Sequence, residues 1–308
     1  MLKLNRIMLI SFLLNAFAGL LLAQTPHEPT HLIIYRGTTV TQVPLSEIDS
    51  IRFESLKNSP MVPLEYVAEY NVGKTPGTFA ESQQNDASGY FPFEEVNSIC
   101  PKGYHTPTRQ EAAVLFPLFG PKYEIYIWFD TKKETIGALE AVQVGDVKAS
   151  YLNDYKSPGG KVCYAIRFQK AEKEAEAGYP AATDNSLRTA YRYEIVGQMA
   201  EGNLDANMKI TARHLGDDFS GSMDDVAKEE FWAANNEADV VRILPSAIYY
   251  HPQFNKEVVG AGAYYWTTTP HETQSTFVWT IAYISKMAYI SYNSDKFKFG
   301  VRPFKNTL

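Results

Sequence analysis

The sequence predicts an α+β main body, in which two helices precede a largely antiparallel sheet, with a small β-hairpin module in front of it. Two observations predict this order. Residues 92–119 carry helix-start signals: Pro92 suits a first helical position, and Thr108 stands three residues before Glu111, the spacing of a capping box. The last part of the chain instead contains short segments rich in aromatic and β-branched residues, separated by turn residues. These segments are VVRILPSAIYY, AYYWTTTP, STFVWTIAYI, KMAYISYNS and FKFGVRPFK.

The N-terminus has the layout of a secretory signal peptide, which we place at residues 1–24. Lys3 and Arg6 precede an apolar run over residues 7–22, and the small residue Ala23 follows it. A membrane anchor is the alternative, but the run is short for a span and polar sequence follows it. No later segment is apolar enough to cross a bilayer. We therefore expect an exported chain with no membrane span after signal cleavage, in the periplasm, at the outer-membrane surface or outside the cell.

Residues 25–58 are expected to form a small β module and a linker. Residues 32–35 and 39–43 are strand-like, and SIRFE is a candidate third strand. The stretch LSEIDSIRF resembles a short N-terminal module of exported proteins from Bacteroidetes-type bacteria. The unit is too small to bury much surface alone, so we expect it to pack on the main body or on another subunit. The main domain is expected over residues 64–308.

The composition of the 308-residue chain is that of an ordinary globular protein, since 45% of its residues are hydrophobic and 21% are charged. The net charge of −6 disfavours nucleic acid as a partner, because binding to a phosphate backbone needs a clustered basic surface. An oxidising compartment would favour pairing of the two cysteines, Cys100 and Cys163. Such a disulfide would stabilise the fold by about 4 kcal/mol, but the sequence does not show that the two sulfur atoms meet.

The stretch CPKGYHTPTRQE raises the question of catalysis, because it places a thiol and an imidazole five positions apart. Pro101 ends the helix expected over residues 92–100, and the capping box begins a second helix over residues 109–119. The residues between them form a rigid connector. A catalytic Cys100–His105 pair would need a lowered thiol pKa, which the C-terminal end of a helix disfavours. We therefore favour a structural corner over a nucleophile and its base.

The middle of the chain, residues 120–197, is predicted to be the least regular part. YEIYIWF, VCYAIRF and TAYRYEIVG are strand-like, and the charge run QKAEKEAEAG is expected to be a solvated loop or a short exposed helix. DDVAKEEFWAA predicts a helix and LEYVAEYNVG a strand. TFVWTIAY predicts a half-buried antiparallel strand with its large residues on one face.

Four motifs stand in order along the main domain. They comprise Cys100, Pro101, Gly103, Tyr104, His105, Pro107, Thr108 and Glu111; then Leu244 and Pro245; then Tyr265, Trp266, Thr267, Thr268 and Thr269; and finally Phe299, Gly300, Val301 and Arg302. Together they resemble the Fibrobacter succinogenes major paralogous domain, a family of exported bacterial domains, over residues 66–308 with an unmatched insertion in the middle. The family often has a cysteine after the final Val-Arg, where this chain has Pro303, and Cys163 is the remaining partner for Cys100.

The resemblance implies a C-type-lectin-like α+β fold and an exported, surface-associated role near fimbrial or adhesion systems. Five residues of the first motif are assigned a structural role: Pro101, Gly103, His105, Thr108 and Glu111. Calcium-dependent sugar binding is not expected, because the main body lacks the Glu-Pro-Asn and Trp-Asn-Asp elements of lectins with this fold.

Metal binding has weak support in the sequence, and zinc is not expected. GDDFSGSMDD gathers four carboxylates, whose hard oxygen atoms suit calcium, but their spacing is not that of an EF-hand. These residues, Asp217, Asp218, Asp224 and Asp225, are retained as weak calcium candidates. The alternative is a solvated loop that caps the next helix. No other metal and no cofactor is expected.

Aromatic residues gather toward the C-terminus, namely Tyr249, Tyr250, Tyr264, Tyr265, Trp266, Trp279 and Tyr283. Such residues suit stacking on a sugar or a peptide as well as sheet packing. We expect Trp266 and Trp279 in the core and Tyr249 and Tyr264 to be more exposed. Tyr249, Tyr264 and Trp266 are the binding candidates.

The favoured function is a non-catalytic exported surface binding or assembly module, associated with adhesion or fimbriae, whose partner is an unknown protein or glycan. A secreted hydrolase acting on polysaccharide or protein is one alternative, although no nucleophile, base and orienting group are visible in the sequence. A purely structural subunit of the cell envelope is the other alternative.

Overall fold

The computed structural model describes residues 31–36, 39–45, 62–84, 86–118, 127–176, 178–198, 206–233, 236, 238–259 and 262–306. The chain divides into two units, Met1–Lys57 and Asn58–Leu308. The expected signal peptide, the candidate third strand SIRFE and the linker up to residue 61 lie outside the described residues. Within the described ranges, no helix is both long and apolar enough to cross a membrane.

The first unit contains the expected β-hairpin. Strand β1 (His31–Arg36) pairs antiparallel with β2 (Thr39–Pro44), with His31 opposite Pro44 and Arg36 opposite Thr39. Pro44 is the last residue of β2, which fits a residue that has no N–H to continue the ladder. Both expected strands are confirmed.

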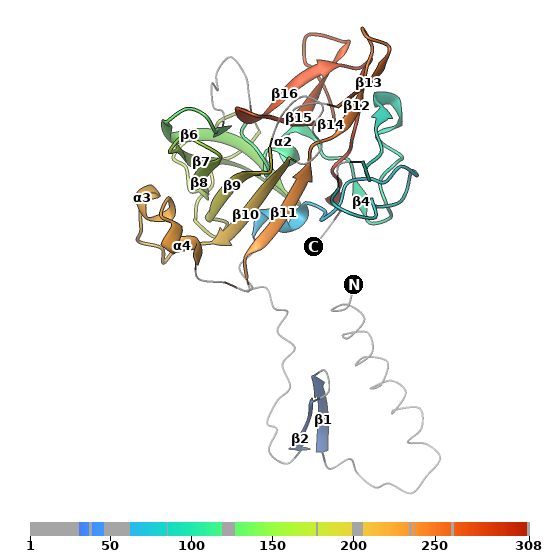
Figure 1. Ribbon diagram of the computed structural model, residues 1–308. Coiled ribbons are helices and arrows are strands. Elements are labelled where there is room, and N and C mark those ends of the chain that lie inside the picture. Colours follow the sequence, from blue (N-terminus) through green and yellow to red (C-terminus); the bar gives the residue numbers. More distant parts are fainter. Residues whose placement is uncertain are drawn as a thin grey trace, which may run out of the picture. The chain divides into compact units, whose positions relative to one another are not determined.

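The second unit consists mostly of antiparallel strands with few, short helices (Figure 1). Its largest sheet has six strands in the order β11-β10-β9-β8-β7-β6, each paired antiparallel with its neighbours. The strands are β6 (Lys133–Val144), β7 (Val147–Ser157), β8 (Val162–Gln169), β9 (Thr189–Val196), β10 (Asn207–His214) and β11 (Val240–Pro245). Because consecutive strands are neighbours, each is joined to the next without a crossover.

Three smaller sheets complete this unit, with the orders β14-β15-β16-β5, β13-β12-β17-β3 and β18-β4. Their strands are β3 (Phe91–Pro92), β4 (Tyr104–His105), β5 (Ile127–Trp128), β12 (Ile248–His251), β13 (Lys256–Val259), β14 (Gly262–Pro270), β15 (Phe277–Ile284), β16 (Met287–Ser294), β17 (Lys298–Phe299) and β18 (Phe304–Lys305). The pairs β3–β17 and β4–β18 join the beginning of the main domain to its end.

Alternation of side chains along the strands builds the core. On β9, Tyr191, Tyr193 and Ile195 are buried and belong to the main hydrophobic cluster, whereas Arg192 and Glu194 point to the other face. The same cluster includes residues of β10, β14, β15 and β16 and the segment around α2 (Arg109–Ala112). We call the face of the six-stranded sheet that bears Tyr191 and Tyr193 its inner face.

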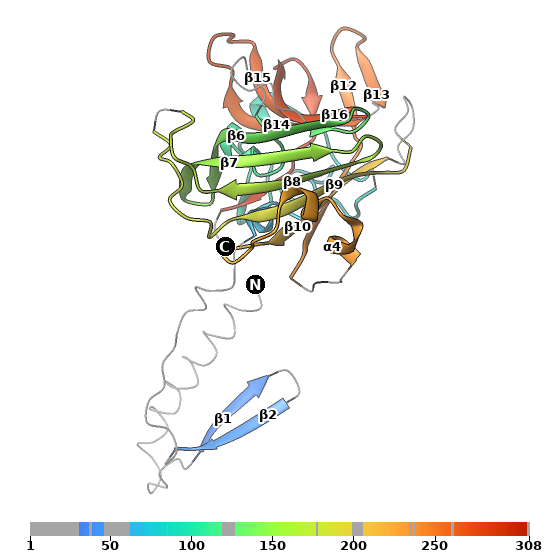
Figure 2. The ribbon, with the colours of Figure 1, turned by 90° about the vertical axis from the view of Figure 1, so that its left-hand side faces the viewer.

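The outer face of the same sheet is partly covered by two short helices, α3 (Met223–Val226) and α4 (Glu229–Ala233), which lie in front of the sheet in Figure 2. Met223 and Val226 pack with Tyr164 and Ile166 of β8. The helices thus shield the outward apolar residues of β8 from water.

The expected helices are shorter than predicted. FPFEEVNSIC forms only a 3-10 turn, η3 (Phe93–Glu95), and the capping box begins α2, which ends after four residues. DDVAKEEFWAA forms α3 and α4 in place of one helix. The predicted strand LEYVAEYNVG is wrong: the 3-10 helix η2 (Pro63–Tyr66) and isolated bridges stand there.

The predicted strands of the C-terminal series are confirmed, and so are two strands of the middle region, VCYAIRF and TAYRYEIVG. The predicted irregularity of the middle region is wrong, because four of the six strands of the largest sheet lie there. The expected half-exposure of TFVWTIAY is also wrong. Val278, Thr280 and Ala282 are buried like Trp279 and Ile281 on the opposite face, because β15 lies between β14 and β16 and is covered on both faces.

Candidate functional site

The connector between Cys100 and Glu111 is held by its own side chains. The Thr106 hydroxyl donates to the carbonyl oxygen of Val96, and the Cys100 sulfur lies 3.3 Å from that hydroxyl oxygen. His105 has other partners, since its Nε2 lies 3.0 Å from Glu111 Oε1. None of the contacts that the structure gives Cys100 or His105 joins one to the other. The geometry is that of a structural corner.

His105 also fastens the corner to the end of the chain. Its Nδ1 lies 2.9 Å from Asn306 Oδ1, and the Asn306 N–H donates to the Gly103 carbonyl at 3.0 Å. Gly103 has φ +88°, a left-handed conformation that favours glycine. Pro101 is buried, and its carbonyl accepts from the Tyr104 N–H at 3.0 Å. The assigned motif residues therefore tie β4 to the C-terminal strand β18.

The capping box forms as the sequence predicts. The Glu111 N–H donates to Thr108 Oγ1 at 3.2 Å, and the Thr108 N–H donates to Glu111 Oε2 at 2.8 Å. Burial alone would raise the pKa of the Glu111 carboxyl, but hydrogen bonds from His105 and Thr108 outweigh it and lower that pKa. The hydrogen bond to Glu111 raises the pKa of His105 against the opposing effect of burial. Glu111 thus caps a helix with one oxygen and holds an imidazole with the other.

Neither cysteine has the environment of a nucleophile. Burial raises the pKa of the Cys100 thiol, although its contact with Thr106 offsets part of the effect. Burial raises the pKa of Cys163 to about 12. The considered disulfide between them is not formed: both are free thiols, and Cys100 packs against the cluster around Trp266 whereas Cys163 belongs to the main core cluster.

Three of the four aspartates considered for calcium have separate roles. Asp225 completes a capping box with Ser222 at the start of α3, and Asp224 pairs with Lys156. Asp217 accepts from the Asn185 N–H at 3.3 Å. In the part of the chain that the structure describes, no three or more His, Cys, Asp and Glu side chains are placed to hold a metal ion. The alternative of a loop that caps the next helix agrees with this arrangement.

One short motif escaped the reasoning from sequence. HEPTH, residues 27–31, has the His-Glu-x-x-His spacing of zinc metalloproteases. That spacing binds zinc only on a helix, where both histidines share a face. Pro29 disfavours a helical turn inside the motif, and His31 is the first residue of strand β1. Residues 27–30 lie outside the described residues.

An aromatic column runs from the core to the surface beside the β12–β13 hairpin. Its rings, in order of contact, are Trp266, Phe299, Phe297, His251 and Phe254, and successive ring centroids lie 4.6, 5.1, 4.9 and 4.3 Å apart. Trp266 is fully buried, whereas Phe254 is 62% exposed. The surface ring is therefore supported by a continuous stack of rings that ends in the core.

The binding candidates lie in or beside this column. Tyr249 and Tyr264 are half-buried, with ring centroids 5.5 Å apart, and both pack on Phe299. Trp266 donates its indole N–H to the Phe91 carbonyl at 2.8 Å, and no part of its side chain reaches the surface. The core positions expected for Trp266 and Trp279 are confirmed, so Trp266 supports the column from within.

One lysine borders the exposed end of the column. Lys256, paired with His251 across the hairpin, has its Nζ 5.9 Å from the centroid of the Phe254 ring. Lys298 alternates with Phe297 and Phe299 and points to the other face, where its Nζ lies 5.4 Å from the centroid of the Tyr250 ring. Neither lysine forms an ion pair with any of the described residues, and the nearby Glu257 accepts from the Tyr90 hydroxyl. The exposed end is thus aromatic with one cation, Lys256, at its border, on a chain whose net charge is −6.

Sequence reasoning missed the outer members of the column, His251, Phe254 and Phe297. His251 and Phe254 flank Pro252 in the turn of a hairpin, where a propensity argument assigns no function. The alternation in KFKFG was the available signal, because it places Phe297 and Phe299 on the same face of a strand.

Comparison with curated proteins finds no match, and comparison with solved structures finds none either. A family model described as a domain of unknown function matches residues 59–304, which contain the aromatic column, the connector from Cys100 to Glu111 and all strands of the second unit except the last residue of β18. The chain therefore belongs to the family described as Domain of unknown function (DUF8237).

Proposed function

We propose that the protein is an exported, non-catalytic binding module of the bacterial cell surface, associated with adhesion or fimbriae. Its partner is a surface protein or glycan. The proposal includes a C-type-lectin-like arrangement within the α+β class and kinship with the Fibrobacter succinogenes major paralogous domain. The motif order in the sequence supports that kinship, and the layout of residues 1–24 supports export.

The observation that carries the proposal is the aromatic column. An exposed ring such as Phe254 is costly to leave in water, and aromatic residues are enriched where proteins bind partners. A ring held by a stack loses little conformational freedom when a partner binds, so more of the contact energy remains as affinity. Lys256 adds a donor for oxygen atoms of the partner.

The state of the corner favours binding over catalysis. The raised thiol pKa of Cys100 leaves little thiolate at neutral pH, and His105 is engaged by Glu111 and Asn306. A side chain with two fixed partners is poorly placed to take a proton from a third.

The proposal is tested by incubating the purified protein with a glycan array and a host-protein array. We expect binding to at least one array member, and we expect Phe254→Ala to weaken it by about tenfold. Ile136→Ala is the matched control, because Ile136 is 74% exposed on β6 and lies outside the column. Array binding that is equal for the two variants, or absent in the unmodified protein, contradicts the proposal.

A further inference from the structure

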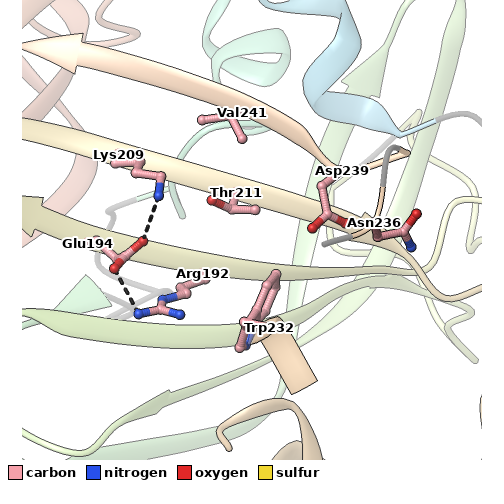
Figure 3. Close-up of a pocket in the computed structure, with 8 residues that line it drawn as sticks. All are labelled: Arg192, Glu194, Lys209, Thr211, Trp232, Asn236, Asp239 and Val241. Carbon is pink, nitrogen blue, oxygen red and sulfur yellow. Dashed lines mark ion pairs between the residues drawn. The ribbon is translucent and has the colours of Figure 1, made fainter. Parts of the chain in front are cut away.

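A hollow of about 450 Å³ lies on the outer face of the six-stranded sheet, beside α4 (Figure 3). Arg192 and Glu194 of β9 and Lys209 and Thr211 of β10 line it, and Val241 of β11 lies on the same side of the sheet. The hollow is within the size range of sites for small molecules. None of its residues belongs to the aromatic column, so it is a separate feature.

Strand pairing fixes the positions of the side chains in the hollow. Lys209 lies opposite Glu194, and Thr211 lies opposite both Arg192 and Val241. Side chains at paired positions on a sheet point to the same face, so these five form a grid whose spacing the backbone ladders set. A site built on strands is better defined than one built on loops.

The charges in the hollow are balanced before any ligand arrives. Glu194 pairs with Arg192 at 2.8 Å and with Lys209 at 3.5 Å, and Arg192 also pairs with Glu229 at 2.9 Å. Asp239 accepts from Arg213, with oxygen–nitrogen distances of 2.7 and 2.8 Å. Figure 3 shows the chain of ion pairs from Lys209 through Glu194 to Arg192 on one side and Asp239 on the other.

Apolar surface borders the same grid. Val241 is 39% exposed although it lies on a strand, and the indole of Trp232 stands beside Arg192. The Trp232 N–H is already used, because it donates to the Val226 carbonyl at 2.8 Å. Trp232 therefore contributes the apolar surface of its ring to the hollow and no polar group.

We propose that this hollow binds one or two rings of a neutral saccharide. A pyranose has hydroxyl groups around its edge and C–H groups on its faces. Glu194 and Asp239 accept hydrogen bonds from the hydroxyl groups, and Arg192 and Lys209 donate hydrogen bonds to them. The C–H groups of the sugar pack on Trp232 and Val241.

Charge balance selects a neutral ligand over a charged one. An anionic sugar would have to compete with Glu194 for Arg192 and Lys209, and a cationic one with Arg192 for Glu194. An anion that displaces Glu194 leaves that carboxylate without its cations, and a cation that displaces Lys209 separates it from Glu194; Arg192 would keep its second partner, Glu229. Either loss costs free energy in a partly desolvated site. A neutral sugar bridges the pairs and separates none of them.

The test is saturation-transfer NMR on the purified protein with cellobiose, maltose and xylobiose as probes and glucuronate and glucosamine as charged counterparts. We expect at least one neutral disaccharide to bind, and we expect Trp232→Ala and Glu194→Gln each to weaken binding by about tenfold. Because Trp232 also packs beside α3, Val241→Glu serves as a second variant. It adds a charge to an exposed position and should abolish binding.

Two controls separate this proposal from the proposed function. Val196→Ala changes an exposed side chain at the end of β9, outside the hollow, and Phe254→Ala changes the aromatic column. Both should bind the disaccharides as the unmodified protein does. The proposal is overturned if no disaccharide binds, if a charged sugar binds more tightly than every neutral one, or if binding survives Glu194→Gln and Val241→Glu but not Phe254→Ala.

Discussion

The two faces of the six-stranded sheet each carry an arginine–glutamate pair, and the two pairs differ in burial. On the inner face, Arg167 lies 3.6 Å from Glu140 and neither side chain is exposed. On the outer face, Arg192 lies 2.8 Å from Glu194, and each side chain is 18% exposed. The residue types are the same, so the surroundings decide what each pair does.

The inner pair holds the fold together. Arg167 donates to the carbonyls of Ala113, Val114 and Leu115 at 2.6, 3.0 and 3.4 Å, where the backbone leaves α2, while Glu140 accepts from Tyr155 and Asn153. Buried charges must be paired and hydrogen-bonded, which fixes their geometry. The outer pair keeps access to water, so a ligand can reach it.

The largest expected effect is that of Arg167→Met. The change leaves Glu140 buried without its cation and removes three hydrogen bonds to the carbonyls that follow α2, so we expect a loss of about 3–5 kcal/mol in the free energy of unfolding. Urea denaturation measures it. The double variant with Glu140→Gln should recover part of the loss, because the uncompensated charge is then gone. A loss under about 1 kcal/mol would mean that burial does not separate the two faces.

The pair His105–Glu111 is a third case, with its imidazole 35% exposed and its carboxylate 10% exposed. The raised pKa of His105 adds stability that is complete below its unfolded pKa and is lost as pH rises through the folded value. The lowered pKa of Glu111 adds stability above its unfolded pKa, lost as pH falls through the folded value. The charged pair therefore contributes most between the unfolded values of 4.5 and 6.5.

His105→Gln tests this third pair, because glutamine keeps a donor toward Glu111 and removes the titrating charge. We expect it to lower the free energy of unfolding by about 1 kcal/mol at about pH 5.5 and by less at about pH 8.5. Urea denaturation at both pH values gives the difference. A loss that is equal at the two pH values would show that the charge of His105 does not stabilise the fold.

The outer pair should matter least for stability. We expect Arg192→Met to change the free energy of unfolding by about 0.5 kcal/mol, because partly solvated ion pairs contribute little. Thermal unfolding of Arg192→Met and of Arg167→Met, measured under the same conditions, compares the two losses of stability. If Arg192→Met destabilises the protein as much as Arg167→Met does, burial does not decide which of the two pairs stabilises the fold.

The two cysteines extend the comparison to covalent chemistry. Cys163 projects from β8 into the main core cluster, and Cys100 lies half-buried in the corner. We expect titration of the denatured, unreduced protein to find two free thiols, and we expect alkylation of the native protein to modify Cys100 before Cys163. Titration that finds no free thiol would contradict the structure of the corner.

The sequence predicted those features that local chemistry determines. The spacing of Thr108 and Glu111 predicted their capping box, and the β-branched and aromatic residues of β8, β9 and β14 predicted strands. It missed β6, because GALEAVQ is composed largely of helix-forming residues and becomes a strand only through pairing with β7. Local propensity cannot show a partner that lies further along the chain.

The candidate sites were less predictable than the fold. The corner drew attention because thiols and imidazoles are reactive residue types, yet their partners bind them into the structure. In the sequence, the charged residues of the hollow only alternate with apolar residues along β9 and β10, as on many exposed strands. It is the register of β9 with β10 that brings Glu194 beside Lys209. A site assembled by strand pairing leaves no compact motif in the sequence.

The central claim is that the protein acts by binding and that its thiol–imidazole corner carries out no reaction. The most direct test measures turnover of the unmodified protein, Cys100→Ala and His105→Ala on a panel of polysaccharide, peptide and ester substrates. The account predicts no turnover that depends on either side chain. Hydrolysis by the unmodified protein that disappears in both variants, while both remain folded, would contradict it.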